Sequence, residues 1–174
     1  AEVFKKMPES GKGLNFYSYV KDGQEVVDSG KFPPLNHSQV LNFFFFVVMH
    51  DYAFWYGDDK GYIEPLYGVI SDRWTKGSDL LWKACNHALN KNEKQFEAVN
   101  FAKIEPKELA QIFSSDNGPI VWPDFEARFR MTRAYGRWFA EEKTSPAVIL
   151  ILANQEEEPL KEFLWWMRRI PGYN

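Results

Sequence analysis

Polar groups and large aromatic rings stand side by side in the segment that runs from residue 50 to residue 56. The segment, His-Asp-Tyr-Ala-Phe-Trp-Tyr, brings a carboxylate next to several flat rings. A planar heterocycle needs rings to stack on and a carboxylate that accepts its ring N–H groups. The alternative is that the rings belong to an ordinary core and that His50 and Asp51 form a satisfied polar pair. The candidate ligand-binding residues are therefore His50, Asp51, Phe54, Trp55 and Tyr56.

Four arginines fall within ten residues of the chain, and three of them share one face of a predicted helix. Arg130, Arg133 and Arg137 are spaced i, i+3 and i+7, with Arg128 just before them. Such a stripe can bind a phosphate group bidentately. The alternative is a solvated face whose arginines pair with acidic residues of the same helix, namely Glu126, Glu141 and Glu142.

Standard catalytic and metal-binding signatures are missing from the sequence. The three histidines lack metal-ligand spacing, and the single cysteine, Cys85, can form neither a zinc knuckle nor an internal disulfide. There is no glycine-rich phosphate loop and no nucleophile elbow. We therefore predict no metal ion and no cofactor, and no catalytic residue is assigned from motifs.

Composition narrows the class of protein. Of the 174 residues, 17% are aromatic, which excludes a disordered chain. The net charge of −3 argues against a stable complex with nucleic acid, since such proteins usually carry a basic excess. The longest apolar run, over 40–49, is far below the roughly 20 residues that span a bilayer. We expect a soluble, cytoplasmic protein without a membrane partner.

The elements that position the candidate residues begin with a hairpin and a helix. Alternation and the turn pair Asp22-Gly23 predict a β-hairpin over 14–28, after a polar stretch over 1–13 that we expect to be flexible. The apolar segment 38–56 contains no turn residue, and its length predicts a buried helix rather than a strand. A loop over 57–61 and an extended stretch over 62–70 follow.

Helices are predicted over the remainder of the chain. Ser78 is placed to cap the first, whose apolar residues recur at positions 80, 81, 84, 85, 88 and 89. Proline at the first turn opens four more, over 107–113, 124–142, 147–154 and 160–169. The chain from 14 to 174 is thus predicted to be a single, mainly α domain with a small N-terminal β-hairpin. The 124–142 helix is expected to turn inward Phe125, Phe129, Thr132, Trp138 and Phe139.

Five blocks of the chain, in the same order, resemble the queuosine salvage family, the queuosine 5′-phosphate N-glycohydrolases. The first two are LNFFFFVVMHDYAFWYGDD and YGVISDRWTKGSDLLWKACNHALN. The third and fourth are IEPKELAQIFSSDNGPI and FEARFRMTRAYGRWF, and the fifth is LKEFLWWMRRIPGYN. The resemblance therefore extends from about residue 34 to residue 174.

This resemblance implies a mainly helical fold related to DNA glycosylases. It also implies hydrolysis of the N-glycosidic bond of queuosine or its 5′-phosphate, which releases the 7-deazaguanine base queuine. Such a reaction needs a carboxylate beside the anomeric carbon and a pocket for the leaving base. Asp51 would contact the base or ribose, and Phe54, Trp55 and Tyr56 would line the base pocket. The implied partner is a small nucleoside or nucleobase.

The chain departs from the family pattern in three ways. Asp51 stands where the family usually has Asn, and His87 stands where it usually has Arg. The family is also close to twice this length, and its later half carries the Ala-Asp-Tyr-Arg-like motif to which the catalytic carboxylate is assigned. No block here matches that half. We therefore expect a fragment, a shortened relative, or one part of a split protein whose second chain completes the site.

Two other functions stay open at this point. The chain can be a non-catalytic module that binds a 7-deazaguanine or nucleoside and lacks the catalytic half. It can also be a glycosylase-like nucleic-acid-binding domain, because Ile170-Pro171-Gly172-Tyr173 after a helix resembles the hairpin of helix-hairpin-helix proteins. The pI of about 5.7 argues against that last function.

Overall fold

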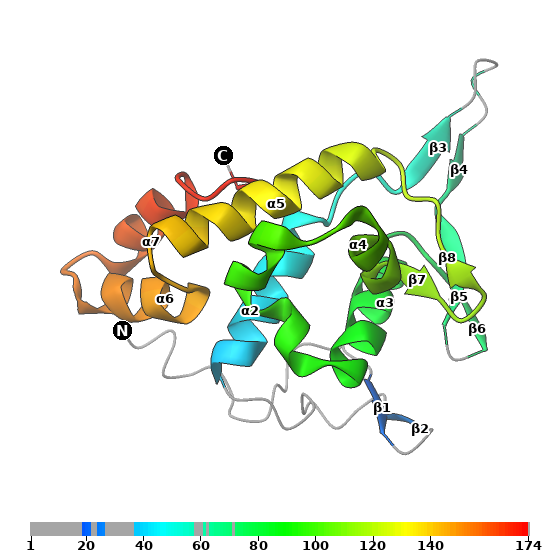
Figure 1. Ribbon diagram of the computed structural model, residues 1–174, viewed down its shortest axis with the longest axis horizontal. Helices are drawn as coiled ribbons and strands as arrows, with labels where there is room; N and C mark the ends of the chain where they lie inside the picture. The colour runs from blue at the N-terminus through cyan, green and yellow to red at the C-terminus, as the bar shows by residue number, and fades with distance from the viewer. Residues whose placement is uncertain are drawn as a thin grey trace.

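Helices dominate the part of the chain that the structure describes, as predicted for a mainly α protein. This computed structural model describes residues 19–21, 24–26, 37–57, 61, 63–70 and 72–173, so the prediction for residues 1–13 lies outside it. Figure 1 shows the long helix α5 crossing the molecule, with α6 and α7 at one end and most of the hairpins at the other. The relation to DNA glycosylases stays a prediction.

The helix α2, His37–Met49, runs through the core. Its phenylalanines at 43 and 46 are fully buried, and Val47 is buried beside them. The ring of Phe46 stacks on Phe101 with centroids 4.5 Å apart. Phe101 belongs to the 3-10 helix η2, Ala98–Lys103, which follows η1, Glu93–Phe96. The prediction of a buried helix is thus confirmed for this segment.

The prediction that this helix continues to residue 56 is wrong. Helix α2 ends at Met49, and residues 51–54 belong to no helix or strand. Ala53 has a positive φ of 52°, which a continuing helix does not allow. The physical reason is tertiary: the carbonyl oxygens of this loop bind an arginine from α5, as described below.

Helix α3, Gly77–Lys91, packs against α2 and carries the apolar residues that the sequence predicted to be inward. The predicted cap is wrong, because the helix begins at Gly77 and its N-cap is Lys76. The hydroxyl of Ser78 instead donates to Asp51. The buried apolar residues at the predicted positions are Leu80, Leu81, Ala84, Cys85, Ala88 and Leu89.

The remaining predicted helices are confirmed with shifts of one or two residues at most of their ends. They are α4, Pro106–Ile112, α5, Phe125–Glu141, α6, Pro146–Gln155, and α7, Pro159–Met167. Ser145 caps α6 by accepting from the amide of Val148. Pro123 lies outside α5, whose N-cap Asp124 has a φ of 53°. Proline is therefore found at the first turn of three of these four helices.

One face of α5 packs closely against η2. The buried residues of α5 are Arg128, Thr132, Tyr135, Gly136 and Phe139, whereas Phe125, Phe129 and Trp138, also predicted to be inward, are only partly buried. A side chain at Gly136 would put its Cβ 2.1 Å from the backbone nitrogen of Ala102. Only glycine lets the two backbones approach this closely.

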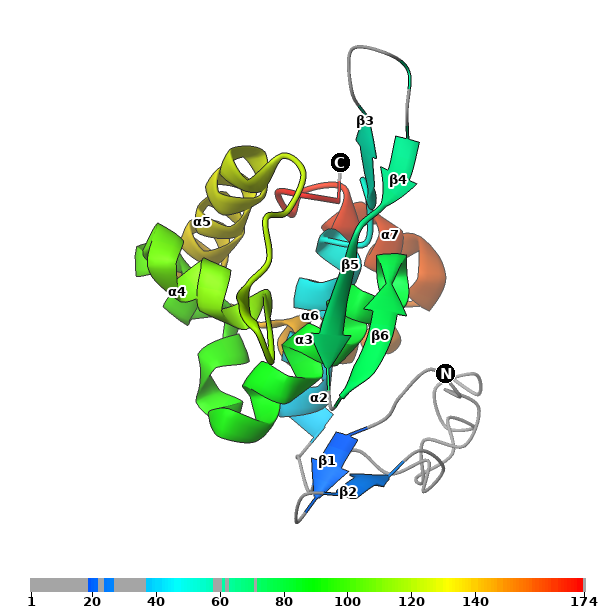
Figure 2. The same ribbon diagram turned by 90° about the vertical axis from the view of Figure 1, so that its right-hand side faces the viewer.

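Within the described residues, the strands form four antiparallel hairpins. The first, β1 Tyr19–Lys21 with β2 Gln24–Val26, confirms the predicted N-terminal hairpin. Figure 2 shows β3–β4 and β5–β6 following one another along one edge of the molecule. A further hairpin, β7–β8, lies beside β5, where the amide of Asp116 donates to the carbonyl of Val69 at 2.9 Å. The bounds are β3 Trp55–Gly57, β4 Ile63–Pro65, β5 Tyr67–Ile70, β6 Arg73–Lys76, β7 Ser114–Ser115 and β8 Gly118–Pro119.

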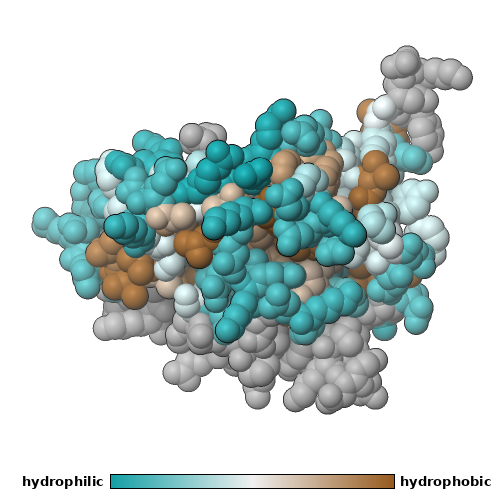
Figure 3. All heavy atoms as spheres, in the orientation of Figure 1, coloured by the Kyte–Doolittle hydropathy of each residue, from teal (hydrophilic) through white to brown (hydrophobic). Residues whose placement is uncertain are grey.

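Helices α6 and α7 leave apolar side chains on the surface. Figure 3 shows hydrophobic residues gathered at the α6–α7 end of the molecule. No helix among the described residues is long and apolar enough to cross a membrane. The exposed apolar residues of these two helices are Val148, Ile151, Leu152, Leu160, Leu164 and Trp165.

Candidate functional site

A buried arginine holds the loop that carries the candidate ligand-binding residues. Arg128 on α5 has no exposed surface, and its Nη1 donates to the carbonyl oxygen of His50 at 2.6 Å. Its Nη2 donates to the carbonyl oxygens of Tyr52 and Ala53. Its Nε donates to the carbonyl oxygen of Pro123 at 3.1 Å. The guanidinium thereby ties residues 50–53 to the start of α5.

The charge of Arg128 is stabilised by backbone dipoles and rings. Burial lowers the pKa of Arg128, while the nearby Tyr52, Asp124, Cys85 and Asp51 raise it. Its Cζ also lies 4.2 Å from the centroid of the Tyr52 ring. A guanidinium keeps its proton in such surroundings and has five N–H groups to satisfy the carbonyls. Arg128 therefore acts as a fixed support for the loop.

His50 belongs to the core. Its Nε2 lies 3.0 Å from the hydroxyl of Thr132, and that hydroxyl donates its one hydrogen to the carbonyl of Arg128 at 2.8 Å. His50 Nε2 must therefore carry the proton in this bond. Burial, followed by the charge of Arg128, holds the pKa of His50 well below its usual range. The structure thus places a neutral imidazole against the rings of Phe46 and Phe113, away from the surface.

Asp51 lies on the surface and contacts α3. Its Oδ1 accepts a hydrogen bond from the hydroxyl of Ser78 at 2.6 Å. Its other oxygen has no partner among the described residues and can accept from a ligand. This contact joins two segments that are 27 positions apart. The carboxylate is therefore held in one orientation while its second oxygen stays accessible.

The three rings after Asp51 separate in the structure. Phe54 turns inward, where its ring lies 6.3 Å from that of Trp122. Trp55 and Tyr56 are consecutive in β3, so their side chains point to opposite faces. Trp55 is 60% exposed, whereas Tyr56 is half-buried and lines a groove. The structure therefore does not bring Phe54, Trp55 and Tyr56 into one slot, and their part in binding stays a prediction.

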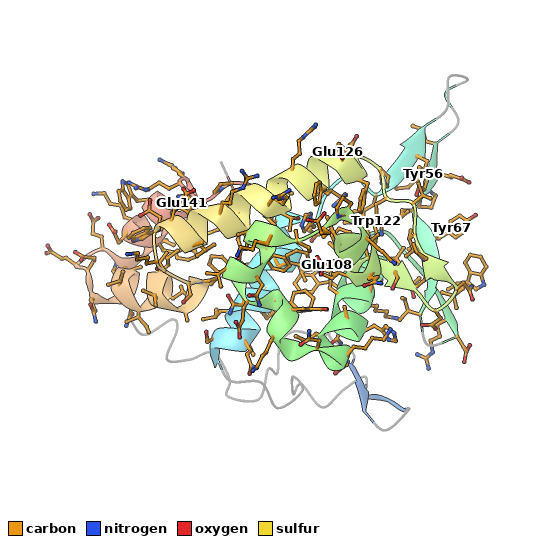
Figure 4. The ribbon with its side chains drawn as sticks, in the orientation of Figure 1. Tyr56, Tyr67, Glu108, Trp122, Glu126 and Glu141 are labelled. Atoms are coloured by element: carbon orange, nitrogen blue, oxygen red, sulfur yellow. The ribbon has the colours of Figure 1, made fainter. Side chains whose placement is uncertain are left out.

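The groove lies where three hairpins meet and has a volume of about 330 Å³. Tyr56 and Glu64 face each other across β3 and β4 in its wall. Figure 4 shows Tyr56 and Tyr67 on neighbouring hairpins at the same end of the molecule. The other lining residues are Gly68, Val69, Trp74, Ser115, Asn117, Pro119, Ile120 and Val121.

The polar groups of the groove lie close enough to one another to influence the pKa of Tyr56. Burial raises the pKa of Tyr56, and the neighbouring Glu64 and Tyr67 raise it further. The rings of Tyr67 and Trp74 touch, with centroids 5.2 Å apart and planes at 47°. A carboxylate beside electron-rich rings, the chemistry sought around Asp51, is thus found here at Glu64.

The predicted arginine stripe lies on the outer side of α5. Arg130 and Arg137 are exposed, and Arg133 is half-buried with its Cζ 5.8 Å from the centroid of Phe129. Arg130 lies 3.7 Å from Glu126, whereas Glu142 contacts Arg169 at 3.8 Å. None of the stripe lines the groove. A role of these arginines in phosphate binding stays a prediction.

The turn after α7 packs inward. Ile170 is fully buried, and the hydroxyl of Tyr173 donates to the carbonyl oxygen of Phe45 in α2. A side chain at Gly172, whose φ is 94°, would collide with Met49. The turn that resembles the hairpin of helix-hairpin-helix proteins therefore packs against α2 in the described part of the chain.

Two features of these sites escaped the sequence analysis. Arg128 lies four residues before Thr132, which was predicted to be inward, so helical spacing placed Arg128 on the same buried face. Glu64 approaches Tyr56 through cross-strand pairing, for which no local signal exists. Among the described residues, no group of three His, Cys, Asp or Glu side chains is placed to hold a metal ion.

Comparison with protein-family models places the chain in a known family. A family model described as "Queuosine salvage protein" matches residues 32–163, well over half of the chain. No curated protein matches the sequence. The matched range contains Asp51, Ser78, Arg128 and the whole lining of the groove.

Proposed function

The chain belongs to the queuosine salvage protein family and has a role in queuosine salvage, and we propose that this role is hydrolysis of an N-glycosidic bond. The substrate is queuosine or its 5′-phosphate, and the product is the free base queuine. The observation that carries the proposal is the Asp51–Ser78 hydrogen bond of 2.6 Å. It sets an exposed carboxylate in a fixed orientation inside the matched range.

The chemistry gives the carboxylate a defined task. Cleavage of an N-glycosidic bond passes through an oxocarbenium-like state, which a nearby carboxylate stabilises. One oxygen of Asp51 is bound by Ser78, and the other can accept from a ribose hydroxyl or from a ring N–H of the base. The exposed ring of Trp55, four residues further on, offers a surface for the flat base.

Arg128 holds the loop that carries Asp51 in place. It binds the carbonyl oxygens on both sides of Asp51, at His50 and at Tyr52. Preorganisation of this kind lowers the cost of holding a substrate in a reactive geometry. A second chain that completes the site stays a proposal for its partner.

The test is release of queuine from queuosine and from its 5′-phosphate, followed by chromatography and mass spectrometry. Asp51→Ala should lower kcat/KM at least about tenfold, because alanine cannot accept a hydrogen bond from the ribose or the base. Asp79→Ala, which removes an exposed carboxylate on α3, is the matched control and should retain full activity. Binding of queuine without release from either substrate would indicate a binding module instead. The absence of both queuine binding and queuine release would contradict the proposal.

A further inference from the structure

The groove between the hairpins is lined by side chains that take no part in the proposed hydrolysis. Its lining includes one charged residue, Glu64, and three aromatic rings, those of Tyr56, Tyr67 and Trp74. Asp51, Ser78 and Trp55 are not part of it. We propose that this groove is a binding site for a small organic ammonium ion, with Glu64 and the three rings as its recognition elements.

The charge balance of the groove favours a cation. The side chain of Glu64 is half-buried, and it forms neither an ion pair nor a hydrogen bond with another described residue. Its negative charge is therefore available to a ligand. A positive ligand placed beside it would supply both the counter-charge and the hydrogen-bond donors. A bound cation would therefore balance a negative charge that no described side chain pairs with.

The rings provide the second part of the site. Trp74 is 75% exposed and Tyr67 is 50% exposed, yet the two rings touch across the β5–β6 hairpin. Their planes meet at 47°, so they form an angled wall rather than a parallel slot. The faces of such rings carry negative charge density and attract ammonium groups with apolar substituents. Tyr56, on the next hairpin (Figure 4), adds a third ring, and Glu64 is its partner across β3 and β4.

The geometry of the groove fits an organic ammonium ion better than a neutral flat base. A base stacks best on one ring or between two parallel rings, and although its N–H groups can donate to Glu64, a neutral base supplies no counter-charge. An ammonium ion with methyl or methylene groups satisfies the carboxylate and the angled wall together. The apolar floor from Ile120 and Val69 accommodates those substituents. The volume of about 330 Å³ matches a small molecule of this class.

The positive charge of Lys76 offers a way to test whether the groove prefers a cation. It pairs with Tyr67 across β5 and β6, so the two side chains share one face of the hairpin, although Lys76 does not line the groove. Its positive charge opposes a cationic ligand and favours an anionic one. Removal of this charge should therefore tighten the binding of an ammonium ion.

Calorimetric titration with choline tests the proposal, and 3,3-dimethylbutan-1-ol serves as the neutral molecule of the same shape. The wild-type chain should bind choline at least about tenfold more tightly than the alcohol. Glu64→Gln and Trp74→Ala should each weaken choline binding by about five- to tenfold. Lys76→Gln should strengthen it about two- to threefold.

Matched controls separate the groove from the rest of the surface. Glu126→Gln changes an exposed carboxylate on α5, and Trp165→Ala changes an exposed tryptophan on α7. Both variants should bind choline as the wild type does. Equal binding of the alcohol and choline, or equal losses in the control variants, would overturn the proposal.

Two further outcomes would reassign the ligand. Binding of guanine in place of choline, with the same loss in Glu64→Gln, would show that the groove holds a flat base. Much tighter binding of a peptide with one trimethyllysine would show a protein side chain as the ligand instead. The choline titration does not depend on queuine release, so its failure and that of the proposed hydrolysis are distinguishable.

Discussion

The Nη1 of Arg128 donates to the carbonyl oxygen of His50 at 2.6 Å, and this bond joins two residues that are 78 positions apart. Together with the bonds to Tyr52 and Ala53, it fixes where helix α2 stops and how the next segment turns. The candidate carboxylate, Asp51, sits inside this loop. The orientation of the proposed site therefore depends on a side chain that is fully buried.

Loss of the Arg128 guanidinium should destabilise the protein strongly. Arg128→Met keeps the apolar stem but leaves the carbonyls of Tyr52 and Pro123 without their donor, and the carbonyl of His50 keeps only the amide of Tyr52. Bonds from charged donors are worth about 1.5–3 kcal/mol each, so the free energy of unfolding should fall by about 3 kcal/mol or more. Urea denaturation followed by circular dichroism measures this change.

Lysine and an exposed arginine provide the comparison for that variant. Arg128→Lys should recover part of the stability, because one ammonium group cannot reach all these carbonyls. Arg130→Met, on the outer side of α5, should change the free energy of unfolding by less than about 0.5 kcal/mol. Equal effects at the two positions would argue against the support role of Arg128.

His50 should make the stability depend on pH. Its pKa is well below the usual value in the folded protein, mainly because the side chain is buried. The unfolded chain takes up a proton near pH 6.5, whereas the folded protein does not, so stability falls as the pH decreases below about 6.5. The slope from this group reaches at most about 1.4 kcal/mol per pH unit. Denaturation curves at several pH values measure it.

The His50→Gln variant should lose that part of the pH slope. His87→Gln should change the slope less, because the pKa of His87 is lowered to a smaller extent by partial burial and Lys91, and Asp116 opposes the shift. Identical slopes in the wild type and in His50→Gln would contradict the buried neutral imidazole.

A methyl group at Gly136 should disrupt the contact between α5 and η2. In Gly136→Ala the new Cβ would meet backbone atoms of Phe101 and Ala102, which cannot move aside like a flexible side chain. Overpacking of this kind costs about 1–3 kcal/mol and more where backbone must shift. Thermal unfolding should show the loss. Gly57→Ala, with no atom within 4 Å of its new Cβ, should unfold as the wild type does.

Ser78 should act on the reaction through Asp51 as a positioning residue. Ser78→Ala removes the 2.6 Å hydrogen bond and should lower kcat for queuine release about tenfold, because a reactive group that is misplaced loses effective molarity. The unfolding free energy should stay within about 1 kcal/mol of the wild type.

A double variant tests whether Ser78 works through Asp51. Adding Ser78→Ala to Asp51→Ala should cause no further loss, because the carboxylate that Ser78 orients is already gone. Ser114→Ala, whose hydroxyl donates to the carbonyl of Gln111, is the serine control and should keep full activity. Additive losses in the double variant would count against the positioning role.

Local sequence patterns were enough to predict most of the helices. The apolar repeat between Leu80 and Leu89 predicted the buried face of α3, and the prolines at 106, 146 and 159 predicted the starts of α4, α6 and α7. These signals act within one or two helical turns, so no distant residue is needed to interpret them. The errors at Ser78 and Pro123 are shifts of an end by one or two residues.

The segment from His50 to Tyr56 shows where local patterns stop. Its residue types already specified a carboxylate among flat rings, and its apolar character already predicted burial for the helix before it. Where that helix ends was decided by Arg128, whose charge is buried and must be satisfied by carbonyls from 75 to 78 positions away. The pairing of β3 with β4 places the side chains of Trp55 and Tyr56 on opposite faces and puts Glu64 opposite Tyr56. Such contacts depend on the packing of the whole chain, because hydrogen bonds and charges act across space irrespective of sequence distance.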